Sequence, residues 1–197
     1  MAAFKTGVLA AFAILLQPAG GAGAAILCGA DERAPALAAN ADWRAAPIRL
    51  AIIDQSVAAS LAEAGRLAGM TVLVSAKTTG RERGRTLAGP FGMVLDAMVK
   101  ANGLTWFTDG GAVHVATGAE TATKTITPTA ARMDVCGALR GAGLDGEGQR
   151  VVTGDRTATR VTGSPDFIST VEAILKSTPS SEASGMTLVK FGQVIHE

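Results

Sequence analysis

The sequence is poor in the residues that build large cores, bind metals or carry a strong charge. It contains no tyrosine, two tryptophans and six phenylalanines in 197 residues, although 48% of its residues are hydrophobic. A core made mainly of small aliphatic side chains suits small modules better than one large domain. The formal net charge is only +1, so no long-range field attracts nucleic acid or an anionic membrane surface.

Residues that carry chemistry are also few. The histidines are His114 and His196, and neither has a cysteine or carboxylate at the spacing of metal ligands. No serine stands in a nucleophile-elbow sequence, so we expect no enzyme activity, cofactor or metal. Residues 141–146 match the GxGxxG pattern, but they follow a predicted helix, whereas the dinucleotide motif follows a strand. They also contain the GXXG pattern of RNA-binding KH domains, yet Asp145 would repel phosphate.

The N-terminus has the layout of a secretory signal peptide. Lys5 supplies a positive charge, residues 6–16 form an uncharged apolar run, and the Ala-Gly-Ala at residues 22–24 offers a cleavage site. We therefore predict a signal peptide over residues 1–25 and an exported, periplasmic protein. An uncleaved membrane anchor is the alternative, although Pro18 and several nearby glycines disfavour a spanning helix.

The two cysteines, Cys28 and Cys136, lie far apart in the sequence. In an oxidising compartment they could pair and close a loop of roughly 100 residues, worth about 4 to 5 kcal/mol through chain entropy. The alternative is a buried Cys136 on a helix and an unrelated Cys28 in a flexible leader. Lipid attachment to Cys28 is disfavoured, because Leu27 precedes it where lipoprotein signals carry a small residue. A disulfide and two separate thiols both remain open here.

Two small modules are predicted after an alanine-rich arm over residues 26–47. The first, over residues 48–118, has the element order β-α-β-β-α-β-β, and the second, over 122–178, has the order β-α-β-β-α. Residues 179–197 form a linker and a terminal strand. The predicted fold class is α+β, with two α/β sandwich modules in tandem. Predicted strands span residues 48–53, 70–74, 81–87, 104–116 (a hairpin), 124–127, 150–153 and 158–163, and predicted helices span 57–68, 91–99, 134–140 and 165–175.

Two features favour contact surfaces over catalysis. Arg81, Arg83 and Arg85 form a basic stripe on a predicted edge strand, which is either a solvated edge protected by charge or a contact with a neighbouring subunit. Trp106 and Phe107 point to opposite faces of one strand. We expect one of the two rings to be in the core and the other to be exposed as part of an interface.

The most distinctive stretch is the hairpin GLTWFTDGGAVHVA at residues 103–116. Together with the helices over 57–69 and 91–99 and the stretch GRERGRTLAG at 80–89, it resembles the secretin and TonB N-terminal short domain. The Trp-aromatic-x-Asp-Gly pattern is typical of the type III secretion branch. The hairpin residues that carry the resemblance are Gly103, Leu104, Trp106, Asp109 and Gly110.

The second module resembles the next secretin domain, which has a KH-like fold. The resemblance rests on ALRGAGL at residues 138–144 and on a strand followed by Gly163 and Pro165 ahead of the last helix. Together the two modules are similar to the N-terminal half of a type III secretion secretin. Full secretins continue into further domains and an outer-membrane channel, so we expect a split secretin of the kind found in rhizobial symbiotic systems; a truncated secretin gene is the alternative.

This resemblance implies a structural role. The chain would be a subunit of a periplasmic ring that assembles with copies of itself, with a separate outer-membrane channel subunit and with inner-membrane basal-body ring proteins, and not with nucleic acid. The alternative is a signalling or binding module of the TonB-receptor type, because the same short domain contacts an inner-membrane regulator there. A periplasmic enzyme is a third class, but the sequence offers no catalytic constellation for it.

Overall fold

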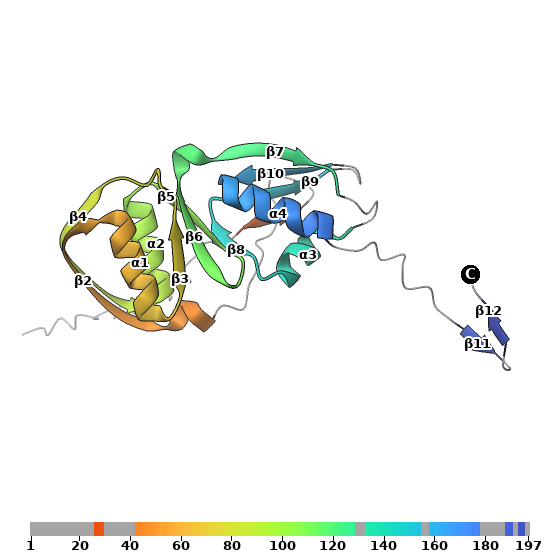
Figure 1. Ribbon diagram of the computed structural model, residues 1–197, viewed down its shortest axis with the longest axis horizontal. Coiled ribbons are helices and arrows are strands. Elements are labelled where there is room, and N and C mark those ends of the chain that lie inside the picture. The colour runs from red at the N-terminus through yellow and green to blue at the C-terminus, as the bar shows by residue number, and fades with distance from the viewer. Residues whose placement is uncertain are drawn as a thin grey trace, which may run out of the picture.

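The computed structural model shows a mixed α+β protein, which confirms the predicted fold class (Figure 1). It describes residues 26–29, 42–128, 133–154, 158–177, 188–190 and 193–195, so the predicted signal peptide lies outside the described residues. The strands are β1 (Leu27–Gly29), β2 (Pro47–Ser56), β3 (Thr71–Val74), β4 (Arg81–Pro90), β5 (Leu104–Thr108), β6 (Ala112–Thr117), β7 (Ala122–Ile126), β8 (Asp145–Glu147), β9 (Arg150–Thr153), β10 (Thr159–Gly163), β11 (Leu188–Lys190) and β12 (Gln193–Ile195). The helices are η1 (Asp42–Ala45), α1 (Val57–Ala68), α2 (Phe91–Ala101), η2 (Gly118–Glu120), α3 (Val135–Gly141) and α4 (Pro165–Ser177).

The first module places two helices between two sheets. β2 and β4 form a long antiparallel ribbon, paired from Pro47 and Pro90 at one end to Ser56 and Arg81 at the other. The second sheet has the strand order β3-β6-β5-β8. Helices α1 and α2 fill the space between the ribbon and this sheet, and their apolar side chains form the core with both (Figure 1).

Local sequence signals explain where the helices of this module begin and end. The Ser56 hydroxyl accepts a hydrogen bond from the Ala59 backbone N–H at 3.1 Å, which caps α1. Gly69 ends the helix with a left-handed φ of 72°. Along α2 the apolar side chains at the predicted spacing are all buried, and Gly103 turns the chain into β5 with a φ of 62°.

The second module is a single four-stranded sheet with helices on one face. The strand order is β1-β9-β10-β7, and α3 and α4 pack against the face that carries Val151 and Val161, both fully buried (Figure 1). The Ser164 hydroxyl accepts a hydrogen bond from the Phe167 backbone N–H at 3.3 Å, and Pro165 starts α4. Near the C-terminus, β11 pairs with β12, where the sequence predicts one extended segment.

Two short strands depart from the predicted organisation, because each joins the sheet of a module from which it is separated in the sequence. Strand β1, within the predicted arm, pairs in parallel with β9 of the second module, while η1 follows it in sequence and packs on the first. Strand β8, within the stretch we expect to be a turn, pairs with β5 of the first module. Their three-residue length gives no periodicity that a sequence pattern could reveal.

A disulfide holds the first of these strands in place. The structure joins Cys28 of β1 to Cys136 of α3, across 108 residues of sequence. Ile26 and Cys28 are both buried in the second core. The bridge therefore fastens the N-terminal segment to the second module. Of the two interpretations left open for these cysteines, the structure agrees with the disulfide.

Candidate interaction site

The basic stripe lies at one end of the β2–β4 ribbon. The guanidinium groups of Arg81 and Arg83 contact the Asp54 carboxylate of β2, with N–O distances of 2.8 and 3.1 Å. These hydrogen bonds lower the pKa of the Asp54 carboxyl. Beside them Ile53 is 88% exposed. Arg81 and Arg83 of the stripe thus form ion pairs on a solvent-facing surface, with one exposed apolar side chain next to them.

Arg85 belongs to a different environment from the other two arginines. It donates a hydrogen bond of 3.1 Å to Glu82, whose side chain is only 5% exposed, and Asn102 donates a second one of 3.2 Å to the same oxygen. A buried carboxylate needs such partners, because an unpaired buried charge is costly. Arg85 therefore has a structural role in balancing Glu82, while Arg81 and Arg83 face solvent.

Trp106 belongs to the core of the first module and is fully buried. Its indole N–H donates to the Asp96 carboxylate at 3.2 Å, and Arg44 donates to the same carboxylate at 2.6 Å. The Arg44 guanidinium lies 5.0 Å from the centre of the Trp106 ring, within cation–π distance. The polar end of the indole is therefore satisfied inside the protein.

Phe107 is also fully buried, which corrects the prediction that one of the two rings is exposed. It belongs to the core of the second module, where it packs edge-on against Phe167 of α4 at a centroid distance of 5.3 Å. His114 of β6 stacks on its other side at 4.5 Å. Because successive side chains of a strand point to opposite faces, β5 supplies one aromatic ring to each core.

His114 also connects the hairpin to α4. Its ring nitrogens lie 3.4 Å from Asp109 in the hairpin turn and 4.0 Å from Asp166 in the first turn of α4. Burial raises the pKa of the Asp109 carboxyl. Hydrogen bonds from the Ala112 and Gly111 backbone N–H groups, together with the nearby His114, lower this pKa by more, so the net shift is a decrease. The carboxylate thereby holds the turn and faces the histidine.

The remaining motif residues have backbone roles. Gly110 has a φ of 86° in the hairpin turn, and Leu104 is buried at the start of β5. A Cβ on Gly163 would meet the Phe167 ring at 2.6 Å, so only glycine lets β10 approach α4 this closely. The motifs on which the resemblance rests thus shape turns and packing, and contribute no reactive group.

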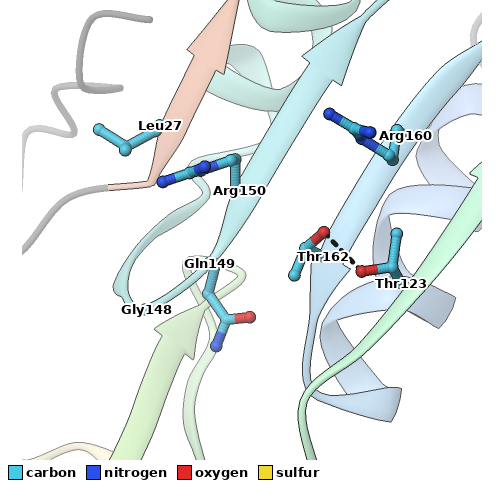
Figure 2. Close-up of a pocket in the computed structure, with 7 residues that line it drawn as sticks. All are labelled: Leu27, Thr123, Gly148, Gln149, Arg150, Arg160 and Thr162. Atoms are coloured by element: carbon cyan, nitrogen blue, oxygen red, sulfur yellow. Dashed lines mark hydrogen bonds between the residues drawn. The ribbon is translucent and has the colours of Figure 1, made fainter. Parts of the chain in front are cut away.

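A cavity of about 420 Å³ lies on the face of the second sheet that α3 and α4 leave uncovered. We call it the arginine pocket, defined by its lining residues Arg150, Arg160, Thr123, Thr162, Leu27, Gly148 and Gln149. Figure 2 shows Arg150 on β9 and Arg160 on β10, with the hydroxyl pair of Thr162 and Thr123 beside them. The two hydroxyl oxygens are 2.9 Å apart.

This pocket is not among the sites that the sequence predicts. A signal was present, because Arg160 and Thr162 alternate with buried residues on β10. Thr123 is an exposed polar residue of β7. The strand register, which brings Arg150 opposite Thr162 and Thr162 opposite Thr123, is set by tertiary pairing. Polar side chains of three separate segments therefore meet only in the folded sheet.

Within the described residues, no group of three or more histidine, cysteine or acidic side chains is placed to hold a metal ion. Among the described helices, none has the length and apolar character needed to cross a bilayer.

No family model matches the sequence, and no curated protein is similar to it. Among solved structures, the chain is similar to one from the Salmonella SPI-1 type III secretion injectisome basal body proteins InvG, PrgH and PrgK, with 17% identity and a TM-score of 0.49. The match covers 64% of this chain and 27% of that chain, so the chain spans about a quarter of that relative's length.

Two further likenesses concern N-terminal domains of secretins. One is to the Salmonella SPI-1 structure of InvG N0N1 with SpaPQR and PrgHK, with 18% identity and a TM-score of 0.48, over 63% of this chain and 88% of that chain. The other is to the N-terminal domain of the secretin XcpQ from Pseudomonas aeruginosa, with 13% identity and a TM-score of 0.24, over 66% of this chain and 62% of that chain. At these identities and TM-scores the likenesses carry no argument about function.

Proposed function

We propose that the chain is a structural subunit of the periplasmic ring of a type III secretion secretin. The observation that carries the proposal is the hairpin over residues 103–116, whose sequence resembles the type III branch of secretin short domains. Its strand β5 supplies Trp106 to one core and Phe107 to the other. Two modules in the expected element orders, joined by this strand, support the same role.

The proposal includes the narrower role of the nodulation protein NolW, the N-terminal part of a split secretin. In that role the chain is exported, lies in the periplasm and joins the outer membrane through a separate channel protein. We also propose inner-membrane basal-body ring proteins as partners, as the resemblance of the hairpin to the type III branch implies.

The surface of the first module suits repeated side-by-side contacts. Ring closure needs heterologous contacts, in which two different patches of neighbouring copies meet. Among the described residues, four large apolar side chains are exposed, and all four lie on the first module: Ile53, Leu67, Leu73 and Met93. They lie on four different elements, the ribbon, α1, β3 and α2, so more than one side of the module has apolar surface to bury against a neighbour.

The test is recovery of the tagged mature protein from envelope membranes, with mass spectrometry of what co-purifies. We expect a separate channel-forming secretin fragment and inner-membrane ring proteins. A clean monomer would contradict the proposal, and recovery of an inner-membrane regulator alone would favour the signalling module instead.

A variant of the basic stripe tests the contact itself. Arg83→Glu should weaken recovery of the ring while leaving the fold intact, because Arg83 is 69% exposed and its ion pair among the described residues is with Asp54. Arg66→Glu is the matched control, since Arg66 is equally exposed and also pairs with a carboxylate, that of Glu63. Arg85→Glu is unsuitable, because it would leave the buried Glu82 carboxylate without its cation. Unchanged assembly of Arg83→Glu would make the stripe a solvated edge.

A further inference from the structure

We propose that the arginine pocket binds carboxylate side chains of an acidic segment from another protein. The proposal does not depend on the ring, because it concerns the purified chain and one face of its second sheet. It rests on the position, charge and hydrogen-bonding capacity of the side chains in the pocket.

The strand register assembles the pocket as one row across the whole sheet. Leu27 of β1 is opposite Arg150 of β9, Arg150 is opposite Thr162 of β10, and Thr162 is opposite Thr123 of β7. Residues paired in this way point to the same face, with neighbouring Cβ atoms roughly 5 Å apart. Arg160 lies two residues from Thr162 on β10 and so faces the same side. Two guanidinium groups and two hydroxyls thus meet on the uncovered face.

The described lining of the pocket is rich in hydrogen-bond donors. No aspartate or glutamate is among these described lining residues. Arg150 is partly buried, and no hydrogen bond or ion pair to its guanidinium group is found among the described residues. The Thr123 and Thr162 hydroxyls bond to each other, which uses one of their two protons and leaves the other to donate. The complement of such a site is an anion.

A carboxylate on a protein segment fits this site better than a polyanion. A planar guanidinium fork matches a carboxylate in two parallel hydrogen bonds. Leu27 gives the pocket an apolar wall for the methylene groups of an aspartate or glutamate. The volume of about 420 Å³ has room for a few side chains. A nucleic acid would need an extended basic surface, and the formal charge of the chain is only +1.

A second copy of this chain is a poor source of the carboxylate. Several carboxylates of the described residues already contact an arginine or lysine of their own chain. Those paired in this way are Asp54, Glu63, Asp96, Glu120 and Glu172. We therefore commit to a partner protein with an acidic segment.

The experiment is calorimetric titration of the full chain, with its disulfide formed, with a capped Gly-Glu-Asp-Glu-Gly peptide. The amide counterpart, Gly-Gln-Asn-Gln-Gly, is the ligand control. We expect the acidic peptide to bind at least tenfold more tightly than the amide peptide, and its affinity to fall as salt is raised. Arg150→Gln should weaken binding by on the order of tenfold, and Thr162→Val by less.

The matched control is Arg140→Gln, at the exposed end of α3, the helix that covers the opposite face of the sheet. Its affinity should equal that of the parent, and thermal melting should show all variants folded. Equal binding of both peptides, unchanged binding by Arg150→Gln, or equal loss in Arg140→Gln would each overturn the proposal. Self-association that Arg150→Gln abolishes, without peptide binding, would assign the pocket to a second copy and overturn it as well.

Discussion

The two modules obtain their cores in different ways. The buried cluster of the first consists of residues between Ile48 and Val115, packed between two sheets without a cross-link. The cluster of the second includes Ile26 and Cys28 from the N-terminal segment and Phe107 from the hairpin of the first module. A module with one sheet and two helices, one of which has only seven residues, buries little surface by itself. The difference indicates that the second module depends on residues from outside its own sequence range and on the disulfide, whereas the first module builds its core from its own residues.

The largest expected effect comes from separating the modules. A fragment of residues 42–121 retains the whole first core and lacks only the edge strand β8 of its second sheet, so we expect it to fold and to show dispersed amide resonances. A fragment of residues 122–178 lacks Phe107, Ile26 and the disulfide partner Cys28, and we expect it to be unfolded in the same buffer. Circular dichroism and NMR would measure both. A folded second fragment would remove the contrast between the modules.

The next effect is the loss of the Cys28–Cys136 bridge. On the chain-entropy model, a loop of about 100 residues contributes roughly 4.7 kcal/mol. We therefore expect Cys28→Ser, or reduction of the parent, to lower the free energy of unfolding of the second module by about that amount. Urea titration monitored by NMR separates the modules. An equal loss in the first module would show that the two unfold as one unit.

Gly146→Ala should separate β8 from the first module. A Cβ at this position would lie 2.5 Å from the Trp106 carbonyl oxygen and 2.7 Å from the Phe107 Cα. Forcing such a group into packed backbone costs about 1–3 kcal/mol. Gly141→Ala is the matched control, because a Cβ there meets no atom within 4 Å. Similar stability of the two variants in chemical denaturation would mean that β8 contributes little to holding the modules together.

The smallest effects are on the pH dependence of stability, where two carboxylates have opposite slopes. Burial raises the pKa of Asp145 above 3.8, so its favourable contribution holds below that pH and declines as pH rises through the folded pKa. Hydrogen bonds from Lys124 and Lys176 lower the pKa of Glu172 from 4.5 to about 2, so its contribution holds above 4.5 and is lost as pH falls towards 2.

Isosteric variants should remove one slope each. Asp145→Asn should flatten the decline in unfolding free energy above about pH 4, and Glu172→Gln should flatten the decline between pH 4.5 and 2. Stability measured at several pH values and at two salt concentrations would check this. The Glu172 effect should also shrink with salt, because its ion pairs are at the surface. A slope unchanged in Asp145→Asn would show that burial of this carboxyl does not control stability.

The sequence by itself determined the local elements and their order. Ser56 and Gly69 mark the ends of α1, the apolar spacing predicts α2, and Asp109 with Gly110 predicts the hairpin turn. Each of these signals acts through neighbours within a few residues, in caps, turns and helical faces. The predicted strands and helices accordingly agree with the structure to within a few residues at their ends.

Only the tertiary structure decided which module each short strand joins and which side chains meet. Nothing local distinguishes Trp106 from Phe107, and their separate cores follow from the docking of α4 on the hairpin. The pairing of Cys28 with Cys136 likewise depends on β1 lying beside β9. The arginine pocket depends on the register of four strands from distant parts of the chain. These contacts are non-local, and their energy is set by packing and pairing that no single stretch of sequence contains.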